Sequence, residues 1–115
     1  MEQKTEFMLV FRFEPNFDRQ PSAAELGEMH QQWGAFIGKL AIQEKLVSTH
    51  QLGFEGKQVY ADHSVTDGIC IADKQTLGGN MIVKANNIDE AVEISKHCPI
   101  LGMGGSVEVR AIQPM

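Results

Sequence analysis

One histidine stands out as a side chain that could move a proton. His30 lies in a segment where Leu26, Trp33 and Ile37 recur at three- and four-residue steps, so we expect its ring between a helix and a sheet. A neutral imidazole in that position could act as a general acid or base. A core histidine bonded to a carbonyl group explains the same pattern, and the sequence leaves the two interpretations open.

Cys98 could supply a nucleophile. It stands directly before Pro99, and a histidine could activate its thiol if the two predicted helices run side by side. A buried, inert thiol is the simpler interpretation. The other cysteine, Cys70, lies on a different element and shares no CxxC spacing with Cys98, so we expect two free thiols in a reducing compartment.

Two arginines on predicted strands could bind an anionic group. Arg12 and Arg110 could each hold a carboxylate by two parallel hydrogen bonds, and pairing with Glu108 or Glu14 is the simpler alternative. Charged side chains near the turns in the middle of the chain could form the rim of a pocket, although turn capping explains an aspartate there equally well. The candidate substrate contacts are Arg12, Trp33, Asp67, Lys74 and Arg110.

The sequence shows no pattern typical of a metal or cofactor site. His50, His63 and His97 are scattered without the short intervals that metal ligands show. The glycine-rich segment 102–105 does not spell GxGxxG, and it leads into a strand, whereas a phosphate-binding loop opens a helix. We therefore expect no cofactor.

Hydrophobic period and capping signals predict the elements that position these residues. The first strand alternates, with phenylalanine and leucine at 7, 9, 11 and 13 on one face. Ser22 with Glu25, and Asn87 with Glu90, have the spacing of helix-capping pairs. The predicted strands are 6–13, 46–54, 58–61, 68–73, 80–85 and 106–112, and the predicted helices run from 22 to about 41 and from 87 to 99.

This order of elements is the split βαβ pattern of a ferredoxin-like α+β fold with an extra hairpin and two helices on one face. A chain of 115 residues has room for a single domain, residues 1–115. Met8 and Val10 oppose the phenylalanine row, so both sheet faces are apolar although helices can cover only one. A homodimer that packs two sheets face to face would bury the second face. The alternative is a monomer with an unusually apolar sheet face.

Composition restricts the partners and the location. The formal net charge of −5 argues against nucleic acid, whose binders carry basic surfaces. No stretch approaches the roughly 20 apolar residues of a membrane span, and Met1–Glu6 is polar where a signal peptide is apolar. We expect a soluble, cytoplasmic protein with no membrane or nucleic-acid partner.

Seven short strings occur along the chain in the order seen in one protein family. They are EFMLVFR at 6–12, MHQQW at 29–33, TDG at 66–68, LGG at 77–79, DEA at 89–91, CP at 98–99 and VEVR at 107–110. Over nearly its whole length the chain resembles YCII-related proteins of the DGPF type. The resemblance implies the dimeric α/β-barrel form of the ferredoxin-like fold, in agreement with the burial argument.

The resemblance also bears on the candidate site, with two departures. YCII proteins proper resemble His–Asp dyad enzymes, and His30 matches the position of their histidine. Cys98 stands where the dyad carboxylate would be, just before the proline that follows the second helix. The DGPF string is replaced by Asp67-Gly68-Ile69-Cys70, so its proline and phenylalanine are both missing.

Three functions fit these observations. The first is a cofactor-free enzyme, lyase- or isomerase-like, in which His30 transfers a proton on a small organic molecule. The second is a small-molecule-binding or regulatory module without catalysis, which the missing dyad carboxylate favours. The third is a purely structural dimer. A carboxylate near His30 would favour the enzyme, and Glu14, Asp67 and Asp73 are the loop residues that could reach it.

Overall fold

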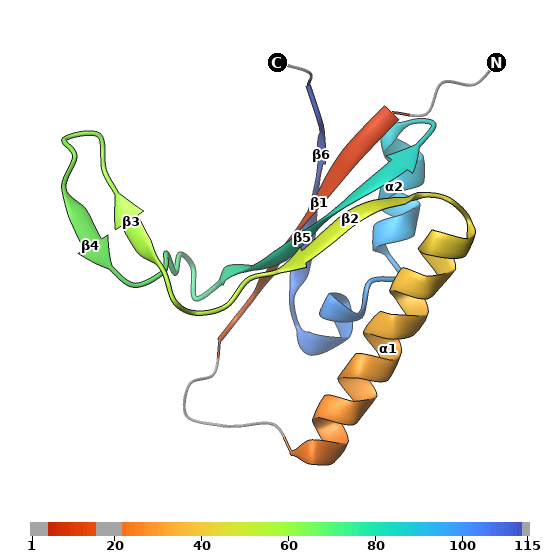
Figure 1. The fold of residues 1–115 in the computed structure, drawn as a ribbon, viewed down its shortest axis with the longest axis horizontal. Helices are drawn as coiled ribbons and strands as arrows, with labels where there is room; N and C mark the ends of the chain where they lie inside the picture. The colour runs from red at the N-terminus through yellow and green to blue at the C-terminus, as the bar shows by residue number, and fades with distance from the viewer. Residues whose placement is uncertain (1–4, 16–21, 114–115) are drawn as a thin grey trace.

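The computed structural model describes residues 5–15 and 22–113. A four-stranded antiparallel sheet has the order β2-β5-β1-β6, and both helices lie on one side of it (Figure 1). This arrangement confirms the predicted α+β, ferredoxin-like fold. The elements are β1 (Thr5–Phe13), α1 (Ala23–Ile42), β2 (Leu46–Gln51), β3 (Lys57–Val59), β4 (Val65–Asp67), β5 (Thr76–Ala85), α2 (Ile88–Ser95), the 3₁₀ helix η1 (Pro99–Met103) and β6 (Ser106–Ala111).

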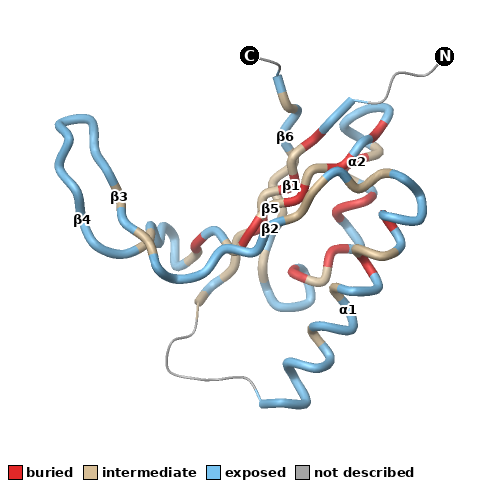
Figure 2. The backbone as a smooth tube through the Cα atoms, viewed as in Figure 1, coloured by how far each residue is buried: buried red, intermediate tan, exposed pale blue. Residues whose placement is uncertain are grey.

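The central strand β1 follows the predicted alternation. Phe7, Leu9 and Phe11 are buried on the helix side, while Met8 and Val10 on the other side are half-buried. Buried backbone segments gather on the middle strands and on the parts of α1 and α2 beside them (Figure 2). Leu9 is completely enclosed, and full burial of such a side chain contributes about 1.5–3 kcal/mol relative to exposure. The core therefore lies between the sheet and the helices.

Helix α1 begins at the predicted cap. The Glu25 backbone N–H donates to Ser22 Oγ at 3.2 Å, which satisfies one of the amides that a helix start leaves unpaired. The helix ends one residue beyond the predicted end, at Ile42.

The buried stripe of α1 differs from the predicted one. The predicted stripe included Leu40, which is buried, and Trp33 and Ile37, which are half-buried. Phe36 lay outside that stripe but is buried, whereas Leu26 and His30 belonged to it and are exposed. The predicted position of the His30 ring, between helix and sheet, is therefore wrong. The N-terminal half of α1 extends past the sheet (Figure 1), so its first turns have no strand to cover.

Helix α2 and the segment after it are partly as predicted. Asn87 caps α2 by accepting from the Glu90 N–H at 2.9 Å, and Ala91 and Ile94 are buried against the sheet as expected. The helix stops at Ser95, however, and the following proline opens η1. Proline suits the first turn of a helix because no N–H is needed there. The predicted loop at 102–105 is therefore helical as far as residue 103.

The hairpin between β2 and β5 reverses earlier than predicted. The Tyr60 N–H donates to the Ser64 carbonyl at 2.9 Å, and Asp62 Oδ1 accepts from the Ser64 N–H at 3.0 Å. This aspartate-centred turn makes β4 span residues 65–67, so the predicted strand at 68–73 is wrong. A second tight turn follows, in which Asp73 and Lys74 both have positive φ, 52° and 66°.

The LGG string lies where β5 packs tightly against both of its neighbouring strands, β1 and β2. A Cβ at Gly78 would lie 2.8 Å from the Phe13 ring, and the register between β1 and β5 shifts beside it, between Phe11 and Arg12. Glycine therefore allows the bulge. Within residues 5–15 and 22–113, no helix has both the length and the apolar character needed to cross a membrane.

Candidate functional site

The sheet face opposite the helices carries both apolar and charged side chains. Residues directly opposite on neighbouring strands share a face, so the pairings Met8 with Ile82 and Val10 with Glu108 define this surface. We call it the open face. It comprises Glu6, Met8, Val10, Arg12, Ser48, His50, Leu77, Asn80, Ile82, Lys84, Ser106, Glu108 and Arg110.

The middle of the open face is apolar. Met8, Val10 and Ile82 are half-buried by their neighbours on the sheet, and no helix covers them. Their cross-strand neighbours are mostly polar, with Asn80 beside Val10 and Ser48 beside Ile82. An apolar patch with a polar rim is typical of a surface that another molecule covers.

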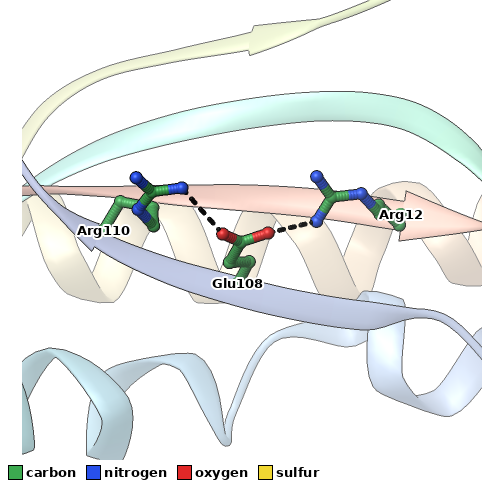
Figure 3. A network of polar contacts seen from close by, with 3 residues as sticks. All are labelled: Arg12, Glu108 and Arg110. Carbon is green, nitrogen blue, oxygen red and sulfur yellow. Dashed lines mark hydrogen bonds and ion pairs between the residues drawn. The ribbon is translucent and has the colours of Figure 1, made fainter.

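A three-residue ion network borders this patch on the β6 side. Arg12 Nη1 donates to Glu108 Oε1 at 2.6 Å, and Arg110 Nη1 donates to Glu108 Oε2 at 3.0 Å (Figure 3). The hydrogen bond from Arg12, and next the one from Arg110, hold the pKa of the Glu108 carboxyl below its ordinary value. The simpler alternative for the two arginines, pairing with Glu108, is therefore present in the structure.

The network has more positive than negative charge. Two guanidinium groups share one carboxylate, and each is bonded to it through a single nitrogen. A guanidinium has five N–H donors, so both arginines retain donors for another acceptor. The side chain of Arg12 is 39% exposed and that of Arg110 is 71% exposed, so a small anion can reach both.

His30 is accessible but isolated from acids. It is exposed on the overhanging half of α1. Within residues 5–15 and 22–113, no hydrogen bond or ion pair joins it to a carboxylate, and Asp67, one of the acids that could have reached it, pairs with Lys57. Among the described residues, His30 therefore has no dyad partner.

Cys98 lies in the core. It is 3% exposed, and burial raises the pKa of its thiol to about 11, although a hydrogen bond from the Ile100 backbone opposes the rise. Helices α1 and α2 flank a common groove, but within residues 5–15 and 22–113 no hydrogen bond joins the Cys98 thiol to a histidine. A thiol with this pKa is protonated at neutral pH and is a poor nucleophile.

The model of the YCII-related domain matches residues 6–115. This chain belongs to the YCII-related family. No curated protein matches its sequence.

The remaining candidate residues of this YCII-related chain are dispersed. Trp33 packs edge-on against Phe11, with ring centroids 5.4 Å apart, so it contributes to helix–sheet packing. Asp67 is at the end of β4, and Lys74 is exposed in the separate turn that precedes β5. Of the predicted substrate contacts, the structure brings together Arg12 and Arg110, through Glu108.

Sequence patterns did not indicate a groove between the C-terminal half of α1 and α2. Phe36, Leu40 and Ile94 line it, together with charged residues including Lys45 and Glu90, whose side chains are 3.7 Å apart. Its volume is about 200 Å³, whereas small-molecule pockets measure roughly 300–1,000 Å³. We regard it as a seam between helices. Among the described residues, no three histidine, cysteine, aspartate or glutamate side chains group as metal ligands.

Proposed function

We propose that this YCII-related protein is a homodimeric binding module, in which two open faces meet and a small organic anion binds beside Arg12 and Arg110. The main support is the pair of guanidinium groups that share one carboxylate at the edge of an uncovered apolar sheet face. This is the second of the functions that the sequence suggested, binding without catalysis. Within residues 5–15 and 22–113, no hydrogen bond or ion pair joins the His30 imidazole or the Cys98 thiol to an acid or a base.

Burial supports the dimer. Met8, Val10 and Ile82 lie on central strands, yet nothing in the described chain covers them from outside. Burial stabilises by about 25 cal/mol for each Å² of apolar surface removed from water, so a second sheet is a favourable cover. A twofold dimer of facing sheets is also the arrangement that the family resemblance implies.

Charge supports the anion site. The open face carries Arg12, Lys84 and Arg110 against Glu6 and Glu108, which gives it a formal charge of +1 in a chain of −5. Guanidinium groups bind carboxylates with two parallel hydrogen bonds, and such charge-assisted bonds are about twice as strong as neutral ones. A small organic acid with an apolar body fits both the arginines and the adjacent patch.

Thermal-shift measurements with a panel of small organic acids test the anion site. A ligand at 100 times its dissociation constant stabilises the native state by about 2.7 kcal/mol. We expect Arg12→Gln to abolish the shift and Lys84→Gln, which removes the same charge from another part of the open face, to preserve it. A shift that survives in Arg12→Gln, or a panel that shifts nothing, would contradict the proposal.

A second candidate function is proton transfer by His30. Its support is the exposure of an imidazole at the position where the resemblance implies a catalytic histidine. A small molecule turned over by the protein would then lose about 10²–10⁴ in rate in His30→Gln, the usual contribution of general acid–base catalysis. Unchanged turnover in that variant would exclude this role.

We also propose a cytoplasmic location. Cys70 is an exposed free thiol, and Cys98 is a buried one. Free thiols are typical of proteins in reducing compartments.

A further inference from the structure

The hairpin between β2 and β5 stands apart from the rest of the molecule. We call residues 52–75 the arm. Its strands β3 and β4 pack against each other and against no other helix or strand of the described chain (Figure 1). The radius of gyration is 15.9 Å, compared with about 13 Å for a compact domain of this length. The arm therefore extends the molecule, and at its base Phe54 packs against Phe13 of β1, with ring centroids 6.1 Å apart.

The arm has an apolar face that nothing in the described part of the chain covers. Val59 and Val65 are directly opposite on its two strands, and they are 71% and 55% exposed. A flanking ion pair joins Lys57 to Asp67 on the same face. An isolated two-stranded hairpin is marginally stable in water at best, and it gains stability by packing an apolar face. The exposed valine pair therefore lacks the cover that such a hairpin needs.

The direction of the arm indicates where that cover lies. In Figure 1, α1 and α2 are on one side of the sheet, and β3 and β4 project away on the other side. The arm continues from the ends of β2 and β5, which are the strands that carry Ser48 and Ile82 on the open face. A molecule seated on the open face would therefore lie beside the arm.

We propose that the arm packs its Val59–Val65 face against a second copy of this chain. The inference rests on the proposed homodimer and adds a second contact region to it. In a twofold dimer each copy receives the arm of the other, so the open face and the Val59–Val65 face are both buried.

The size of the open face supports a second copy as the occupant. With strands about 4.8 Å apart and a rise of about 3.3 Å per residue, four strands of six residues project about 400 Å². A standard interface buries about 800 Å² on each partner. The sheet alone is therefore too small, and the arm supplies additional contact area.

Charge also supports a second copy. The arm carries Glu55, Asp62, Asp67 and Asp73 against Lys57 and Lys74, so its formal charge is −2. The open face has a formal charge of +1. Opposite charges on the arm of one copy and the open face of the other favour their approach.

Sedimentation equilibrium of a matched pair of double variants tests the arm. Val59→Thr with Val65→Thr keeps the branched side chains that suit a strand but places a hydroxyl on the apolar face. We expect this variant to weaken the dimer by at least about tenfold. The control, Gln58→Ser with Thr66→Ser, alters the opposite face of the same hairpin and should leave the dissociation constant within about twofold.

Hydrogen exchange at the Tyr60 and His63 amides, whose hydrogen bonds close the hairpin, provides a second measurement. We expect both to exchange more slowly above the dissociation constant than below it, because the dimer holds the arm. A wild-type chain that is monomeric throughout would overturn the proposed homodimer and the arm contact together. A wild-type dimer with an unchanged dissociation constant in the valine variant, or with arm amides insensitive to concentration, would overturn the arm contact alone.

Discussion

Leu9 and Val10 are neighbours on the central strand, yet they face different surroundings. Leu9 lies under the helices and is fully enclosed, whereas Val10 faces outward and is half-buried only by its neighbours on the sheet. The same contrast extends along the sheet, with Met81 and Val83 enclosed and Ile82 between them on the open face. One strand thus carries two apolar surfaces, and residues 5–15 and 22–113 cover one of them.

The two faces of the sheet differ in what they contribute to the protein. The helix side has apolar side chains in close contact, and its thiol at Cys98 is kept protonated by burial. The open face combines an apolar centre with Arg12, Glu108 and Arg110, all accessible to solvent. We infer that the helix side stabilises the domain and that the open face meets its partners.

The largest expected effect comes from a matched pair of substitutions on β1. Leu9→Ala leaves a cavity in the core and should lower the free energy of unfolding by about 2–5 kcal/mol. Val10→Ala should lower the free energy of unfolding of the dissociated chain by about 1 kcal/mol or less. Because it also weakens the dimer, it should cause a further loss of stability that grows with protein concentration. Urea denaturation at several protein concentrations measures both. Equal, concentration-independent losses in the two variants would show that the faces do not differ.

The second largest effect concerns the two thiols, Cys70 and Cys98, which should react at very different rates. At pH 8 a pKa of about 11 leaves about one Cys98 thiol in a thousand ionised, and burial limits access further. We expect Cys70, which is exposed, to react with a disulfide reagent at least about a hundredfold faster. Cys70→Ser should remove the fast phase and Cys98→Ser the slow one. A single fast phase that accounts for both thiols would contradict the enclosed core.

The smallest expected effect concerns the ion network. Its bonds hold the pKa of Glu108 below 4.5, so their stabilisation is complete above pH 4.5 and is lost as the pH falls through the folded pKa. Glu108→Gln should remove this part of the acid dependence. In a carboxyl NMR titration, Arg12→Gln should raise the pKa of Glu108 more than Arg110→Gln does, because the Arg12 bond contributes most. The opposite order would assign the main contact to Arg110.

Strong local patterns predicted most of the fold from the sequence. The alternation in β1 and the caps at Ser22 and Asn87 each depend on a few neighbouring residues, and the structure contains all three. Phe36 was missed because the apolar residues of α1 fit more than one stripe, and only the extent of the sheet decides which stripe is buried. The hairpin was misplaced because three-residue strands show too little alternation to define a register.

The candidate site was less predictable than the fold. Arg12 and Arg110 could be placed on strands, but their sharing of Glu108 depends on the pairing of β1 with β6 across nearly the whole chain. The exposure of His30 depends on how far α1 reaches past the sheet, which no local pattern encodes. Contacts between distant segments determine both.

Light scattering of the wild-type protein at micromolar concentration tests the central claim most directly, since the open face is an interface only if a second chain covers it. We predict a mass about twice the 12.7 kDa of one chain. Val10→Asp should return the mass toward that of a single chain, because it would place an unpaired charge at the centre of the interface. A mass of one chain for the wild-type protein, or an unaltered dimer in the Val10→Asp variant, would contradict the account.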